Sequence, residues 1–257
     1  MNRCDCVKRR SIAEIEISEY VKTIYDRQIL TNYRQLTKFE LDVFLPDIKI
    51  GFEYNGVYWH SDKPIDYHLN KTNKCKQLGI TLYHIFEYDY INKPNVIKDI
   101  IKQAIYPIVI DGAKLTKTSI TNSQYVEFVN QYNLQQPNFS DHIVGLVDKN
   151  NDLVATLSYT IEFNNVDVVQ YTTKHSIVIR SLFEQLFTNC QITVKTNTDY
   201  QQQIPFMNDS FKITETIDPQ PTYTHNVRVL TEQQARLYNN CNCTYNCGFQ
   251  VLTKDLI

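Results

Sequence analysis

Two carboxylates lie inside a pair of short apolar segments near the start of the chain. Asp42 and Glu53 flank a Pro46-Asp47 turn, and most of their neighbours are aliphatic or aromatic. A carboxylate in a half-buried strand is costly unless another group pairs with it. Hard divalent cations prefer such oxygen ligands, and carboxylate-rich sites suit Mg²⁺ or Mn²⁺. We therefore predict that Asp42 and Glu53 bind a metal.

The spacing of these residues predicts a hairpin. If Pro46-Asp47 forms a two-residue loop, Asp42 lies opposite Gly51 on the partner strand. Asp42 and Glu53 would then be diagonal neighbours about 7–8 Å apart on one face, and the alternate residues would form the core. A longer loop would shift this register. Structural roles without function remain open for both residues. Asp42 could cap a turn, and Glu53 could pair with a lysine on a solvated face of the sheet.

Other side chains could move a proton. His60 follows the two carboxylates closely and can exchange a proton near neutral pH, although it could instead pack beside Trp59. Asp62 could orient His60 or simply lie in an exposed turn. Glu14 falls on the apolar face of a predicted helix, where it could face the site or occupy a first turn capped by Ser11.

A following helix carries two more candidates. His68 and Lys71 share one helical face with Cys75, and they would contact either a phosphate or water. Basic residues nearby are candidate phosphate contacts, although runs of this kind are more often solvated faces. These residues are Lys8, Arg9, Arg10, Lys74 and Lys76.

Taken together, these segments resemble the metal-dependent nucleases of the PD-(D/E)XK superfamily, in particular the very-short-patch repair endonuclease branch and related phage homing endonucleases. The matched pieces are residues 11–17, 40–42, 53–61, 67–71 and 75–87. The resemblance implies a metal-dependent endodeoxyribonuclease acting on double-stranded DNA, with proton transfer at His60. Asn55 stands where the superfamily has a lysine.

Composition sets the outer bounds. The chain has 257 residues, 42% hydrophobic and 21% charged, which is typical of a globular protein of up to two domains. Seven cysteines in no regular framework predict reduced thiols and a cytoplasmic location, and no membrane span is expected. Residues 1–107 hold 16 basic and 14 acidic residues, a balance of +2, whereas the remainder holds 10 and 14, a balance of −4.

We predict two domains, with the boundary near Tyr106-Pro107. Residues 1–107 form an α/β nuclease domain with a mixed sheet flanked by helices, and residues 108–257 form an α+β domain. The second half resembles, more weakly, the acetyltransferase-like modules found behind such nucleases. Its turn at residues 173–177 lacks the glycines with which an acyltransferase would present amide groups to a pyrophosphate. A recognition or scaffold role is therefore expected there, without a small-molecule cofactor.

Two other functions remain open from the sequence. One is an inactive, nuclease-fold DNA-binding protein, which the missing lysine at Asn55 allows. The other is an acyltransferase delivered to DNA by its N-terminal domain, which predicts an opening between the central strands of the second domain. The oligomeric state and the binding of zinc by the cysteines are not decided by the sequence.

Overall fold

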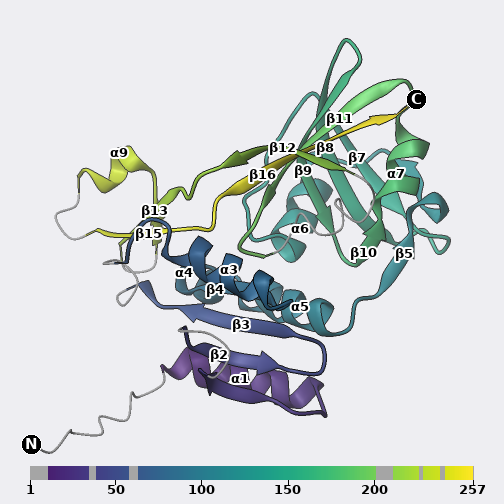
Figure 1. Cartoon of the computed structure of the whole chain (residues 1–257). Helices are drawn as coiled ribbons and strands as arrows, with labels where there is room; N and C mark the ends of the chain where they lie inside the picture. Colours follow the sequence, from purple (N-terminus) through teal and green to yellow (C-terminus); the bar gives the residue numbers. More distant parts are fainter. Residues whose placement is uncertain are drawn as a thin grey trace, which may run out of the picture.

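The structure of the chain is a computed structural model that describes residues 11–34, 39–57, 63–200, 211–225, 228–237 and 241–256 (Figure 1). Predictions that concern Lys8, Arg9, Arg10, His60 and Asp62 fall outside these residues. In the described part, no helix is long and apolar enough to cross a membrane.

The N-terminal half is a four-stranded sheet covered by helices on both faces. Its strands, in spatial order, are β1 (Leu30–Tyr33), β2 (Leu41–Leu45), β3 (Ile50–Asn55) and β4 (Thr81–Phe86). The first three are antiparallel, and β3 and β4 are parallel. The helices are α1 (Ile12–Ile24), α3 (Tyr67–Gln77), α4 (Glu87–Asn92) and α5 (Pro94–Ile105). The α3 helix connects the parallel pair, as such a crossover requires.

The hairpin register differs from the predicted one. Phe44 pairs with Gly51 and Leu45 pairs with Ile50, so the connection spans residues 46–49. Lys49 closes it with a φ of 53°, in the left-handed region. The two-residue loop was therefore wrong, and the observed register places Asp42 directly opposite Glu53 rather than diagonally.

Both faces of this sheet are buried. One face packs against α1 and α5, and the cluster there includes Ile17, Val21, Val43, Phe52, Ile97 and Ile101. The other packs against α3, with a cluster made of Leu41, Phe44, Cys75, Ile80 and Leu82. The predicted apolar face of α1 is confirmed, whereas the expectation of a solvated face behind Glu53 is wrong because α3 covers it.

The C-terminal half is built on a seven-stranded sheet. In spatial order its strands are β12 (Lys212–Ile217), β16 (Phe249–Leu256), β11 (Cys190–Asn197), β9 (Asn165–Thr173), β8 (Leu153–Glu162), β7 (His142–Val147) and β6 (Thr116–Thr118). Its main helices are α6 (Asn122–Tyr132) and α7 (Ile179–Leu186). The layout is mixed α/β.

Smaller elements complete this half. The segment after α5 forms β5 (Val109–Asp111), which pairs in parallel with β10 (Ser176–Val178), and then a short 3-10 turn, η1 (Gly112–Lys114). A three-stranded sheet of β14 (Arg228–Leu230), β13 (Pro221–His225) and β15 (Asn242–Tyr245), with α9 (Glu232–Ala235), lies between β12 and β16 in sequence. Figure 1 shows β13 and β15 extending to one side of the large sheet. The sequence did not predict this sheet.

The two halves share a core. Tyr200 and Leu134, from the C-terminal half, pack into the cluster formed by α1, α5 and the first sheet. The backbone amide of His84 in β4 donates to the carbonyl of Asp199 at 3.0 Å. The segment that follows β11 therefore makes a backbone hydrogen bond with the edge strand β4 of the N-terminal sheet.

A glycine in the connection to β16 provides a first test of the fold. Gly248 has a φ of 84°, and a Cβ there would lie 2.3 Å from the carbonyl oxygen of Ile217. We expect Gly248→Ala to lower the free energy of unfolding by about 2–4 kcal/mol, measured by urea denaturation. Gly79→Ala is the matched control, because its φ is 71° but the nearest atom is a lysine side-chain nitrogen at 3.8 Å. It should cost only about 1 kcal/mol; equal losses would contradict the backbone clash.

Candidate functional site

Three predicted site residues converge in the N-terminal sheet. The Lys71 ammonium of α3 forms an ion pair with Oε1 of Glu53, and their side chains are only 1% and 8% exposed. Glu53 Oε2 also accepts a hydrogen bond from the amide of Asp42 at 3.3 Å. Asp42 Oδ2 in turn accepts from the amide of Tyr54 at 2.8 Å. Lysine and the two carboxylates thus form one buried cluster, which we call the Lys71 cluster.

Burial dominates the electrostatics of this cluster. It raises the pKa of Asp42 to about 8, and the charge of Glu53 adds to the effect, while Lys71 opposes it. Burial also raises the pKa of Glu53, again against the attraction of Lys71. For Lys71, burial lowers the pKa, but the Glu53 carboxylate outweighs it and the net direction is upward. The raised pKa of Asp42 favours its protonated form at neutral pH, and the raised pKa of Lys71 keeps its ammonium group charged.

Glu14 lies at the margin of this cluster. Its amide donates to Oγ of Ser11 at 3.1 Å, so it occupies the capped first turn of α1. Its negative charge nonetheless contributes to the raised pKa of Asp42. Both interpretations of Glu14, as a first-turn residue and as a residue that faces the carboxylates, are therefore compatible with its position.

His68 and Lys71 are not phosphate contacts on a solvated surface, as was considered from the sequence. Both are 1% exposed, because the face of α3 that carries them packs onto the sheet. The His68 ring lies edge-on to the rings of His84 and Phe86, with centroids 5.2 and 5.3 Å apart. Lys74 and Lys76, by contrast, are exposed in the last turn of α3, where binding to double-stranded DNA stays a prediction.

A second polar network crosses the interface between the halves. His84 Nδ1 lies 3.1 Å from the side-chain amide of Asn55, and His84 Nε2 lies 2.8 Å from Oγ1 of Thr72. Since the amide nitrogen is a donor, Nδ1 accepts and Nε2 carries the proton. Thr72 Oγ1 is 3.5 Å from Sγ of Cys247, in the C-terminal half. The network therefore joins β3, β4 and α3 to the segment before β16.

Buried acids continue this network. Asp199 Oδ1 accepts from the amide of Cys247 at 2.6 Å, and burial raises the pKa of Asp199 to about 6. Asp89 of α4 accepts from the hydroxyl of Tyr200 at 2.7 Å, and burial raises the pKa of Asp89 to about 7. The sequence indicated none of Asp89, Asp199 and Tyr200, because an isolated acid or tyrosine carries no periodic signal.

The central strands of the large sheet form a further candidate site. The strands β9 and β11 are its one parallel pair, and they pair only over residues 165–168 and 191–194. However, β9 continues to Thr173 and β11 to Asn197. Beyond Val168 the two strands therefore diverge. Tyr171 lies in the part of β9 that pairs with β8 but no longer with β11, and its carbonyl is 3.4 Å from the side-chain amide of Asn133.

The turn after β9 lies at this divergence. The amide of Lys174 donates to the carbonyl of Val154 at 2.9 Å, and Thr173 Oγ1 accepts from the amide of His175 at 3.2 Å. The α7 helix follows after β10, and its first turn contains no acidic residue. In open sheets, ligands bind at the carboxyl ends of parallel strands, and helix N-termini favour anions. The divergence therefore has the topology of a ligand site.

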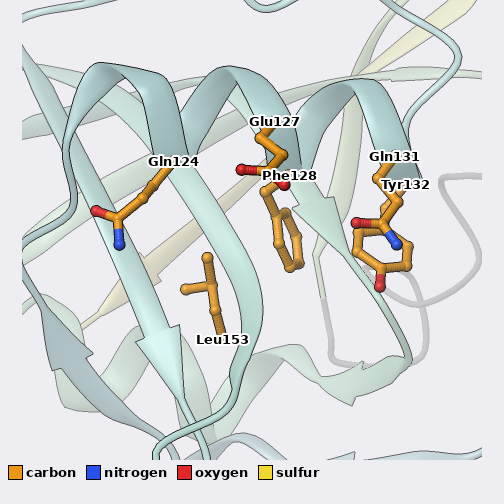
Figure 2. Close-up of a pocket in the computed structure, with 6 residues that line it drawn as sticks. All are labelled: Gln124, Glu127, Phe128, Gln131, Tyr132 and Leu153. Atoms are coloured by element: carbon orange, nitrogen blue, oxygen red, sulfur yellow. The ribbon is translucent and has the colours of Figure 1, made fainter.

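A surface pocket lies beside α6 (Figure 2). Its volume is about 210 Å³, and it is lined by Gln124, Glu127, Phe128, Gln131, Tyr132 and Leu153. Figure 2 shows that all but Leu153, from the start of β8, come from the single helix α6. Gln124 is already engaged in the capping box of α6 with Thr121. The pocket lacks convergent charged groups from several elements.

Comparisons with known proteins concern the fold. No model of a protein family matches the sequence, and no curated protein matches it. A ribosomal-protein-S18-alanine N-acetyltransferase from Escherichia coli is similar in structure, with a TM-score of 0.35 and 8% identity over 55% of this chain and 94% of that chain. A protein described as an acetyltransferase from Sphaerobacter thermophilus has a TM-score of 0.23 and 7% identity over 44% and 68%. The mixed α/β fold resembles acetyltransferase folds.

These findings correct the predicted activity. The predicted metal-dependent endodeoxyribonuclease is contradicted, because the similar structures are described as acetyltransferases and not as nucleases. Within the described ranges, no group of three or more His, Cys, Asp or Glu residues could hold a metal ion. In the Lys71 cluster the ammonium of Lys71 pairs with Glu53, so a lysine supplies part of the charge compensation that was predicted to come from a metal. The binding of Mg²⁺ or Mn²⁺ stays an untested prediction, since His60 and Asp62 lie outside the described residues.

Proposed function

We propose that the C-terminal half is an acyltransferase that binds a phosphate-bearing acyl thioester where β9 and β11 diverge. The observation that carries this proposal is the loss of pairing after Val168 and Val194 while both strands continue. An open strand edge supplies backbone donors and acceptors to an extended ligand, as in strand addition. The proposal departs from the expectation that no small-molecule cofactor is bound.

The residues at the divergence fit such a donor. The backbone of β9 between Val168 and Thr173 would hold the extended amide-containing arm. Lys174 and the N-terminus of α7 would hold the phosphates, because Lys174 is a cation and the first turn of α7, which follows β10, contains no acidic residue. The turn lacks glycine, and the amide of His175 is engaged by Thr173. Phosphate binding there would depend on Lys174 and the first amides of α7.

When bound, a thioester supplies an activated acyl group: its C–S bond breaks as a bond to an acceptor amine forms, and the amine proton passes to the departing thiolate or to solvent. The contribution of this chain is to bind and orient the donor at the carboxyl end of β9. Side-chain amide and hydroxyl groups nearby, at Asn133 and Thr172, are hydrogen-bonded to each other at 2.9 Å. They would hold the loop after α6 against the donor arm.

Binding of acetyl-coenzyme A tests this proposal. We expect the full-length protein to bind it with micromolar affinity in isothermal titration calorimetry, and Lys174→Glu to weaken binding by tenfold or more, because a cation beside the phosphates becomes an anion. Lys149→Glu, with the same charge change in the β7–β8 turn, is the control and should bind as the wild type does. An absence of binding by the wild type at millimolar acetyl-coenzyme A would overturn the proposal.

A further inference from the structure

The N-terminal half holds the carboxyl ends of both diverging strands. At the end of β9, the side-chain amide of Gln103 in α5 donates to the carbonyl of Lys174 at 2.5 Å. At the end of β11, the amide of His84 donates to the carbonyl of Asp199 at 3.0 Å, and Tyr200 donates to Asp89 of α4 at 2.7 Å. The N-terminal half therefore contacts the chain at the ends of both β9 and β11, the two strands that diverge.

These contacts come from a rigid support. The inner face of α5 is buried in the shared core through Val96, Ile97, Ile101 and Ile105. Tyr200 packs into the same core. At the start of α5, the Lys93 ammonium donates to the carbonyl of Asn133 at 2.7 Å, and the Asn133 side chain contacts β9 beyond the end of its pairing with β11. The α5 helix thus contacts the divergence at both of its ends.

We infer that Gln103 and the Asp89–Tyr200 pair are positioning residues that set the separation of β9 and β11. This inference rests on the proposed function, since the separation would fix the space for the acyl thioester. A binding site built between two strands requires both edges to be held before the ligand arrives, because ordering them on binding would weaken affinity. The N-terminal half would thereby be part of the binding machinery of the C-terminal half.

The effect of each contact follows from the strength of one hydrogen bond. Loss of a partly buried hydrogen bond should weaken acetyl-coenzyme A binding roughly three- to tenfold. Gln103→Leu removes the donor and keeps the side-chain size, whereas Gln103→Arg keeps an N–H donor of similar reach. Tyr200→Phe removes only the hydroxyl group and retains the ring in the shared core. Lys102→Gln, at the exposed neighbouring position, is the control.

The experiment combines calorimetry with hydrogen exchange on the full-length variants. In Gln103→Leu we expect weaker binding, faster amide exchange in residues 169–175 and an unchanged melting temperature, with binding restored in Gln103→Arg. In Tyr200→Phe the faster exchange should appear in residues 195–200. Unchanged exchange and unchanged affinity in both variants would overturn the inference. If the wild type binds no acetyl-coenzyme A, the proposed function fails, and exchange in these two segments still decides whether the residues position the strands.

Discussion

Replacing Lys71 by methionine should lower the free energy of unfolding by about 3–5 kcal/mol. Lys71 is the partner of Glu53 in an ion pair that is almost fully buried. Methionine would fill much of the same space but would leave the Glu53 carboxylate in an apolar environment beside Asp42. Such a charge must either remain unpaired or take up a proton, and both are costly. Urea denaturation at pH 7 would measure the loss.

Two further variants separate charge pairing from packing. Lys74→Met changes an exposed lysine of the same helix and should alter stability by no more than about 0.5 kcal/mol. The double variant Lys71→Met with Glu53→Gln removes both charges, so much of the loss should be recovered. A Lys71→Met protein as stable as Lys74→Met would show that the ion pair does not compensate the Glu53 charge.

The stability of the wild type should fall as the pH rises from about 4 to about 8. Burial raises the pKa of Asp42 to about 8, above its ordinary value of 3.8, so the folded state favours the protonated acid. An acid whose pKa is higher in the folded state contributes its full stabilisation of that state below its pKa in the unfolded state. This contribution is lost as the pH rises to the pKa of the folded state. The unfolding free energy should decrease by up to about 1.4 kcal/mol per pH unit near and below pH 8.

Asp42→Asn is the control for this pH dependence. It keeps the shape of the side chain and removes the titration, so the slope between pH 7 and 9 should disappear. A slope at lower pH should remain, because burial also raises the pKa of Asp89 to about 7 and that of Asp199 to about 6. Urea denaturation at each half unit of pH would show this. A wild-type stability that stays constant or rises between pH 7 and 9 would contradict a protonated Asp42.

Much of the element pattern could be predicted from the sequence. The apolar periodicity of α1 and the alternating strands around residues 41–55 and 143–172 specify their own secondary structure, because each buries one face or stripe. The hairpin register could not be predicted in this way. It depends on the left-handed φ of Lys49, and few non-glycine residues adopt that conformation.

The sequence analysis named the residues of the Lys71 cluster as site residues but did not predict how their charges are compensated. Asp42, Glu53 and Lys71 all carried a signal, because charged residues on apolar faces need compensation. The sequence could not show which cation supplies it. A metal ion and an ammonium group satisfy the same requirement, and the answer depends on how α3 packs over β3. One signal was available: Lys71 lies four residues before the buried Cys75, which places both on the inward face of the helix.

The shared core has a consequence for how the chain is made. Thr72 of the first half is in contact with Cys247, ten residues from the C-terminus, and the edge of β4 is completed by Asp199. During synthesis the N-terminal half leaves the ribosome long before Asp199 and Cys247 do. Until then, the buried polar groups that contact these two residues have no hydrogen-bond partner there. Contacts so distant in sequence also slow the final step of folding. The N-terminal half is synthesised first, but it is therefore among the last parts of the protein to reach the native state.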